Sequence, residues 1–242
     1  MGKKAIAGIY DFRKAGKTAF KISGFVGYMG ALSGQVPGGF SVTIDTRFYP
    51  DGVWEMFDEI IFSIENSNAS LVSFLTRTAL ETKYNFTEAV KFLETYPLIA
   101  DVYYTVAGVN PGEGIVIARN RTDTANSTVI NMNQNKWYVL VTNYDWWKPQ
   151  PWFDDRYGPA IVYLDKMGYN NCTIAGLMEV MTTKPVTFIH FSYFFFSILQ
   201  TQFNAKKGPQ SPDHLHLCLY AKECHLRDLY PFLQLPVRFL FL

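Results

Sequence analysis

The order in which two hydrophobic periodicities follow each other constrains the fold of this chain most strongly. Alternating apolar and polar residues, typical of half-buried strands, occur on both sides of a central block in which apolar residues recur at helical spacing. The strand-like stretches are KTAFKI and FSVTID before the block, and ADVYYTVAG, GIVIARN, VINM and KWYVLV after it. Strands, then helices, then strands predict an α+β fold in which helices pack on a sheet.

The central block predicts several helices between Val53 and Tyr96 that cover one face of a sheet. Its apolar residues are Trp54, Phe57, Ile61 and Ile64, followed by the stretches LVSFLTRTAL and TEAVKFLETY. Asn85 with Glu88 three residues later matches the capping box that begins a helix. A last helix is expected at TIAGLMEVMT.

The stretch VTNYDWWKP, from Val141 to Pro149, is the most unusual end of any predicted strand. Alternation in KWYVLV predicts that Val139 and Val141 face one side of a sheet, with Tyr138, Leu140 and Thr142 facing the other. The strand then ends in polar residues and two tryptophans, although loops are usually polar and variable. We therefore interpret this strand end as a candidate functional site.

Charge and hydropathy exclude two classes of protein. The net charge is +1 and the basic residues are scattered, which is unlike the concentrated positive charge of nucleic-acid-binding proteins. The longest apolar segment, Phe191 to Leu199, is shorter than the roughly 20 residues that a membrane-spanning helix needs. We expect neither a nucleic-acid partner nor a transmembrane segment.

Potential N-glycosylation sequons suggest passage through the secretory pathway. They occur at Asn68, Asn85, Asn120, Asn126 and Asn171. The opening MGKKAIAGIYDF lacks the apolar run of a signal peptide. Together these observations lead us to expect that the natural N-terminal segment is missing.

The C-terminal segment from residue 187 to 242 has no sustained periodicity, and we expect it to be a poorly ordered tail. It contains His214, His216, Cys218, Cys224 and His225, residue types that could bind zinc. No paired C-x-x-C or H-x-x-x-H spacing is present, however, so chance composition is the favoured interpretation. We expect neither a metal nor a cofactor.

Several motifs of residues 9–186 resemble the acid ceramidase and N-acylethanolamine acid amidase family. They are, in chain order, GFVGYMGALSGQVPGGFSVTIDTRF, SFLTRTALE, PLIADVYYTVAG, VTNYDWWKP, FDDR and TTKPV. The resemblance implies an N-terminal-nucleophile hydrolase with an αββα sandwich of four layers, present here incompletely. It also implies a lysosomal or secreted cysteine amidohydrolase that acts on N-acyl lipids.

The resemblance assigns catalytic roles to Asn143 and Arg156. Asn143 matches the family asparagine that helps to form the oxyanion hole, and Arg156, in FDDR, matches a second active-site residue. Arg156 would serve the same region or pair with Asp154 or Asp155. The simpler alternatives are a strand cap for Asn143 and a surface salt bridge for Arg156. The two tryptophans of VTNYDWWKP would line an acyl-chain groove or pack in the core.

The nucleophilic cysteine of the family would lie N-terminal to the region that this chain matches. No cysteine precedes Cys172, which lies inside the sequon NCT at an expected helix start and is unsuited to that role. We therefore expect a chain that is inactive as given, whose partner would be a missing segment resembling the N-terminal α-subunit. Two alternatives stay open: an N-acylethanolamine substrate in place of ceramide, and a non-catalytic remnant that binds lipid or pairs with a subunit.

Overall fold

A computed structural model describes residues 7–47, 61–62, 64–152, 155–182 and 197–199 of the 242-residue chain. The strands are β1 (Ala7–Lys14), β2 (Lys17–Phe25), β3 (Ser33–Val36), β4 (Phe40–Thr46), β5 (Val102–Gly108), β6 (Gly114–Arg119), β7 (Thr124–Val129), β8 (Val139–Val141) and β9 (Ser197–Leu199). The helices are α2 (Val72–Thr82), α3 (Phe86–Thr95), α4 (Tyr157–Met167) and α5 (Ile174–Thr182), with short 3-10 turns η1 (Met132–Gln134) and η2 (Tyr169–Asn171).

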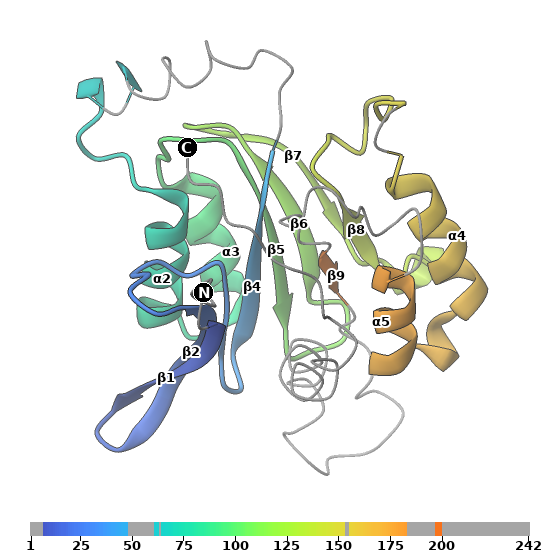
Figure 1. The fold of residues 1–242 in the computed structure, drawn as a ribbon, viewed down its shortest axis with the longest axis horizontal. Helices are drawn as coiled ribbons and strands as arrows, with labels where there is room; N and C mark the ends of the chain where they lie inside the picture. Colours follow the sequence, from blue (N-terminus) through green and yellow to red (C-terminus); the bar gives the residue numbers. More distant parts are fainter. Residues whose placement is uncertain (1–6, 48–60, 63, 153–154, 183–196, 200–242) are drawn as a thin grey trace, which may run out of the picture.

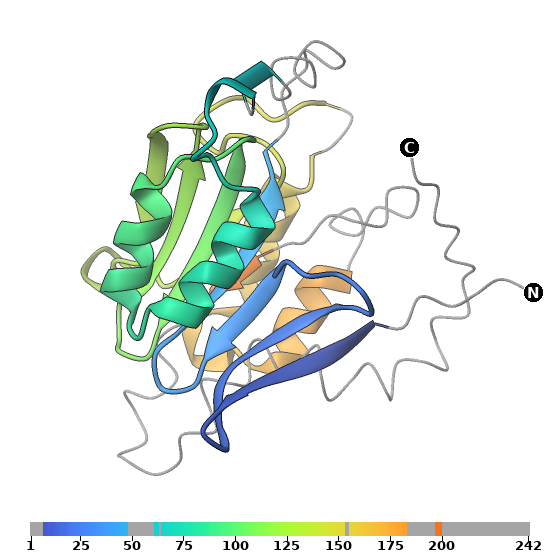
Figure 2. The ribbon, with the colours of Figure 1, turned by 90° about the vertical axis from the view of Figure 1, so that its left-hand side faces the viewer.

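Strands β1 to β7 form one antiparallel sheet in which each strand pairs with its neighbours in sequence. Helices α2 and α3 are inserted between β4 and β5, which still pair over seven residues from Phe40 opposite Gly108 to Thr46 opposite Val102. The β1–β2 hairpin extends away from the body of the sheet (Figure 2). The prediction of an α+β fold is confirmed.

The two faces of this sheet bury different sets of residues, as the twofold alternation of a strand requires. In β5, Val102, Tyr104 and Val106 pack in the cluster that contains the buried residues of α2 and α3. Tyr103 and Ala107 point to the opposite face and pack with residues of β6 and β8. Figure 1 shows α2 and α3 on one side of the sheet and α4 and α5 on the other.

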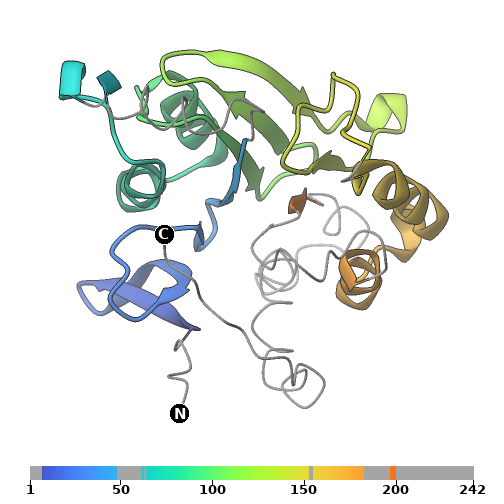
Figure 3. The same cartoon turned by 45° about the horizontal axis from the view of Figure 1, so that its top comes forward.

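Strand β8 lies over the second face of the sheet and separates it from α4 and α5. Val139 and Val141 pack toward the seven-stranded sheet, whereas Leu140 packs with Tyr138 and the buried residues of α4 and α5. The two predicted faces of this strand are thus confirmed for these four residues. Strand β9 pairs antiparallel with β8, and Figure 3 shows the helix pairs on opposite sides of the strands.

Helix α3 begins with the predicted capping interactions. The Asn85 side chain accepts a hydrogen bond from the backbone N–H of Glu88 at 2.9 Å, and its amide donates to the Glu88 carboxylate at 2.8 Å. At the other end of α3, the fully buried Arg119 guanidinium donates to the carbonyl oxygens of Leu93 and Tyr96. These carbonyls belong to the last turn, which has no intrahelical donors of its own, so Arg119 fixes the end of α3 to the sheet.

The structure corrects one expected strand and adds the strands β1, β3 and β7 and one helix, α4, that were not expected. A strand was expected at VINM, but β7 ends at Val129 and Met132 begins the turn η1, because the asparagine-rich segment reverses there with Asn135 in the left-handed conformation. Helix α4 contains Pro159 as its third residue, and proline is tolerated in the first turn, whose N–H groups have no helical acceptor.

Part of the expected helical block cannot be compared with the structure. Trp54 and Phe57 lie outside the described residues, as do the histidines and cysteines of the tail. Ile61 and Ile64 are exposed, so they do not contribute to the expected apolar stripe.

None of the helices in the described part of the chain combines the length and the apolar character needed to cross a membrane. Those same residues contain no group of three or more potential metal ligands.

Candidate functional site

Asn143 lies two residues beyond the end of β8 and is almost completely buried, with 2% of its surface exposed. Its side-chain Nδ2 donates a hydrogen bond to the carbonyl oxygen of Thr46, the last residue of β4, at 3.0 Å. Its Oδ1 accepts a hydrogen bond from Nη2 of Arg156 at 2.9 Å. The side chain therefore connects the two layers of strands and is held at both ends.

Arg156 occupies the N-cap position of α4 and is also buried. Its contact with Asn143 places both predicted residues at the same point, although 13 positions separate them in the sequence. The alternative of a surface salt bridge does not fit a side chain that is 3% exposed. Asp155, one of the two partners considered, is exposed and accepts a hydrogen bond from the backbone N–H of Gly158.

A buried ion pair lies directly beside Asn143. Arg47, which follows β4, donates from Nε to Oδ1 of Asp145 at 2.7 Å and from Nη2 to Oδ2 at 3.1 Å. The hydroxyl of Tyr103 in β5 donates to Oδ1 of the same carboxylate at 2.6 Å, and Lys148 Nζ lies 2.9 Å from Oδ2. Parallel N–H donors on both carboxylate oxygens give this pair a fixed geometry. We call Arg47, Asp145 and Tyr103 the anchor cluster.

Arg47 also binds the ends of two further strands. Its Nη1 donates to the carbonyl oxygen of Arg119 at 3.2 Å and to Oδ1 of Asn120 at 2.8 Å, and it lies 3.6 Å from a carboxylate oxygen of Asp101. Asp101 precedes β5, and Arg119 ends β6. One buried cation therefore joins the ends of β4, β5 and β6 to the segment that follows β8.

Hydrogen bonding in the anchor cluster changes the acidity of its members. Burial alone would raise the pKa of Asp145, but the hydrogen bonds from Arg47, Tyr103 and Lys148 outweigh it and lower the pKa from 3.8 to about 2. Burial, together with the adjacent Asp145 carboxylate, raises the pKa of Tyr103. Asp145 is thus an anion and Tyr103 a neutral donor throughout the mildly acidic range.

The two tryptophans of VTNYDWWKP differ in their surroundings. Trp146 packs against the buried residues of the second sheet face, with its ring centroid 6.1 Å from that of Tyr103. Trp147 lies over the Arg47 guanidinium at 5.5 Å and is 38% exposed. Core packing therefore accounts for Trp146, and Trp147 covers the buried cation. Trp152, farther along the same loop, is 91% exposed.

A row of hydroxyl side chains crosses the sheet on the face turned away from α2 and α3. Ser23 and Ser33 lie opposite each other with their oxygens 2.8 Å apart, Ser33 lies opposite Thr43, and Thr43 lies opposite Thr105. Ser33, Thr43 and Thr105 are buried. Sequence analysis missed this row because small polar residues alternating with apolar ones are usually solvent-facing.

The expected modification sites differ in accessibility. Asn68, Asn85 and Asn171 are exposed, whereas Asn120 and Asn126 are half-buried. The Asn120 side chain is bonded to Arg47 and to Asp123.

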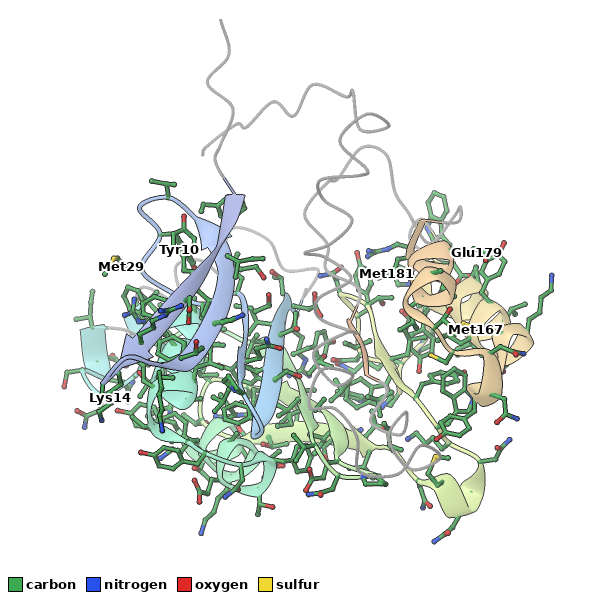
Figure 4. The ribbon with its side chains drawn as sticks, turned by 90° about the horizontal axis from the view of Figure 1, so that it is seen from below. Tyr10, Lys14, Met29, Met167, Glu179 and Met181 are labelled. Atoms are coloured by element: carbon green, nitrogen blue, oxygen red, sulfur yellow. The ribbon has the colours of Figure 1, made fainter. Side chains whose placement is uncertain are left out.

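Cys172 is fully buried among residues of α4 and α5. Figure 4 shows Met167 and Met181 of this helical region at the end of the molecule opposite Tyr10 and Lys14 of β1.

The chemistry available at this site is hydrogen-bond donation in a water-poor environment. An asparagine amide has two N–H groups, and Thr46 is the acceptor for Asn143 Nδ2 among the described residues. The second N–H, together with the permanently charged Arg156, can stabilise a negatively charged oxygen. The family resemblance pointed to Asn143 and Arg156, which the structure brings into contact. Arg47 and Tyr103 were not predicted; their signal in the sequence is a charged or hydroxylated side chain inside or directly after an apolar strand.

Comparisons with known proteins give the relatives of this chain. The chain is 38% identical to the acid ceramidase of Heterocephalus glaber over 176 residues, which are 73% of this chain and 44% of that protein. It is 40% identical to the N-acylethanolamine-hydrolyzing acid amidase of Cavia porcellus over 176 residues, 73% of this chain and 48% of that protein. No protein-family model matches the chain.

A solved structure extends the similarity to the fold. The Caenorhabditis elegans orthologue of N-acylethanolamine-hydrolyzing acid amidase superimposes with a TM-score of 0.66 and 34% identity, covering 75% of each chain. The fold is thus that of an acid amidase over most of the chain. The chain belongs to the family of acid ceramidase and N-acylethanolamine-hydrolyzing acid amidase. It spans less than half the length of the curated relatives that it matches.

Proposed function

We propose that this chain forms the body of an amidohydrolase that splits the amide bond of ceramide into a fatty acid and a sphingoid base. The observation that carries the proposal is the buried contact between Asn143 and Arg156, in which Arg156 Nη2 donates to Asn143 Oδ1 and a guanidinium lies against an asparagine amide. Membership of a family of lipid amidases supplies the class of substrate.

In this proposal Asn143 and Arg156 stabilise the oxyanion of the tetrahedral intermediate. Attack on an amide carbonyl places a negative charge on its oxygen, and donors that are already oriented stabilise that charge without reorganising. Asn143 meets this requirement because Thr46 and Arg156 hold its amide at both ends. Arg156 adds a full positive charge at the same point.

The attacking thiolate would come from a cysteine outside the region described here. Cys172 does not fit the role, because it is fully buried in the cluster formed by α4 and α5. In this proposal the family's nucleophilic cysteine would precede the matched region, and the chain as given would hydrolyse neither substrate, since oxyanion donors without a nucleophile retain only a small part of the rate enhancement. The layers formed by α2 and α3, the large sheet, β8 with β9, and α4 with α5 support an incomplete αββα sandwich of the N-terminal-nucleophile type.

A lysosomal or secreted location completes the proposal. Its support is the family and the exposure of the sequon asparagines Asn68, Asn85 and Asn171. An N-acylethanolamine is the second candidate substrate. Its support is the 40% identity to the acid amidase, which is similar to the 38% identity to acid ceramidase. A remnant that binds lipid without cleaving it is the remaining alternative.

A chimera tests the proposed function. The segment of human acid ceramidase that precedes the aligned region would be joined to this chain at Ile9, and release of labelled fatty acid would be measured from ceramide and from an N-acylethanolamine at mildly acidic pH. We expect the chimera to hydrolyse ceramide, with activity abolished by a thiol alkylator, and the chain alone to be inactive. The control chimera has alanine in place of the nucleophilic cysteine.

Two results would contradict the proposal. A folded, soluble chimera that releases fatty acid from neither amide would favour a lipid-binding remnant. Alkylator-sensitive hydrolysis by the unmodified chain would show that the nucleophile lies within the residues given.

A further inference from the structure

The segment that carries Asn143 is attached to the end of β4 at two successive places. Asn143 Nδ2 donates to the carbonyl oxygen of Thr46, the last residue of β4. The residue that follows Thr46 is Arg47, which donates two hydrogen bonds to Asp145. Asn143 and Asp145 are two positions apart, at a bend of the chain after β8, and their partners Thr46 and Arg47 are consecutive residues. Both attachments therefore pull the segment against the same neighbour.

The second attachment is rigid because each of its members has further partners. Asp145 also accepts from the Tyr103 hydroxyl at 2.6 Å, and Arg47 also donates to Arg119 and Asn120. Arg47 and Asp145 have 5% and 6% of their surfaces exposed. A bidentate pair with this burial leaves little freedom for the backbone between Asn143 and Asp145.

We propose that the anchor cluster of Arg47, Asp145 and Tyr103 is a positioning device that sets the direction of the Asn143 amide. The proposal rests on the proposed function, since it assigns Asn143 the oxyanion. The three residues act through Asn143, so they are positioning residues. Displacement of an oriented group by about 1 Å can cost about 100-fold in rate, which is the effect expected when the attachment is lost.

Nuclear magnetic resonance of the chain itself gives the first test. The chain would be labelled with ¹⁵N-asparagine, and the Asn143 Nδ2 signals would be assigned by their loss in Asn143→Asp. We expect Asp145→Asn to shift these signals and to speed their hydrogen exchange at least tenfold. Tyr103→Phe removes only the hydroxyl, keeps the buried ring, and is expected to cause a smaller change of the same kind.

A matched control separates positioning from general destabilisation. Glu81→Gln breaks the 2.8 Å ion pair between Arg77 and Glu81 on the exposed side of α2 and should leave the Asn143 signals unchanged. Backbone amides of β5 and β6 should keep their protection in Tyr103→Phe. Unchanged Asn143 signals in both Asp145→Asn and Tyr103→Phe would overturn the proposal.

Kinetics of the chimera give the second test. Tyr103→Phe and Asp145→Asn should lower kcat, by about 100-fold for Asp145→Asn, with KM within twofold of the parent, and Arg47→Lys should retain part of the activity. An active chimera whose kcat is unaffected by both variants would overturn the positioning role. If the chimera hydrolyses neither amide, the proposed function fails, while the resonance measurement still decides whether the anchor cluster orients Asn143.

Discussion

Replacing Asp145 with asparagine should destabilise the chain in a way that depends on pH. The wild-type carboxylate accepts hydrogen bonds from Arg47 and Tyr103 and is 6% exposed. The variant keeps the shape of the side chain but loses its charge, so among the described residues Arg47 stays buried with the carboxylate of Asp101 at 3.6 Å.

The size of the effect follows from the acidity of Asp145. Its pKa falls from 3.8 to about 2 in the folded chain, and each unit of difference between the unfolded and folded pKa corresponds to about 1.4 kcal/mol. Ionised Asp145 therefore contributes about 2–3 kcal/mol to the free energy of unfolding. Because the folded pKa is the lower one, this contribution is fully present well above pH 3.8 and is lost as the pH falls through about 2.

Urea unfolding followed by tryptophan fluorescence between pH 2 and pH 7 would measure this effect. We expect the free energy of unfolding of the wild type to exceed that of Asp145→Asn by about 2–4 kcal/mol near neutral pH, since removing one partner of a buried pair also leaves a buried charge. The difference should persist at mildly acidic pH and shrink below about pH 4. A difference that is absent at neutral pH, or that stays constant down to pH 2, would show that the charge of Asp145 does not stabilise the folded chain.

Three further substitutions test the local structure by urea unfolding. Asn85→Ala removes the N-cap of α3 and should lower the free energy of unfolding by about 1 kcal/mol, whereas Asn68→Ala, in an exposed turn, should change it by less than about 0.5 kcal/mol. Arg119→Met leaves the last carbonyls of α3 without their charged donor and should cost about 3 kcal/mol, with faster hydrogen exchange at the end of that helix; unchanged exchange would refute the capping role. Leu164→Ala opens a cavity under α4 and should cost about 2–5 kcal/mol, while Val162→Ala on its exposed side should cost little; equal effects would contradict the assigned helix faces.

Features fixed by short-range patterns could be predicted from the sequence. The capping box at Asn85 involves residues three apart, and the two faces of β8 follow from alternation over a few residues. Strand β7 was harder to recognise, because it is an edge strand of small polar residues that is half exposed along its length. Its sequence, TANSTV, has no apolar alternation to detect.

Contacts between distant segments could not be predicted in the same way. Arg47 and Asp145 are 98 positions apart, and Tyr103 lies 42 positions from Asp145. Only the pairing of β4 with β5, and the placement of β8 over the sheet, bring the three together. Asn143 and Arg156 were identified because family resemblance already contains this long-range information. For the anchor cluster, the available local signal was Arg47, a charged residue directly after an apolar strand.

The rate of ceramide hydrolysis by the chimera with Asn143→Ala tests directly whether the Asn143 amide stabilises the oxyanion. We expect kcat to fall by about 10²–10³-fold with little change in KM, because one oriented oxyanion donor is removed. The folded structure should persist, as judged by unfolding at the same pH. A variant chimera that keeps the full kcat would show that Asn143 does not stabilise the oxyanion, and would contradict the account of this site.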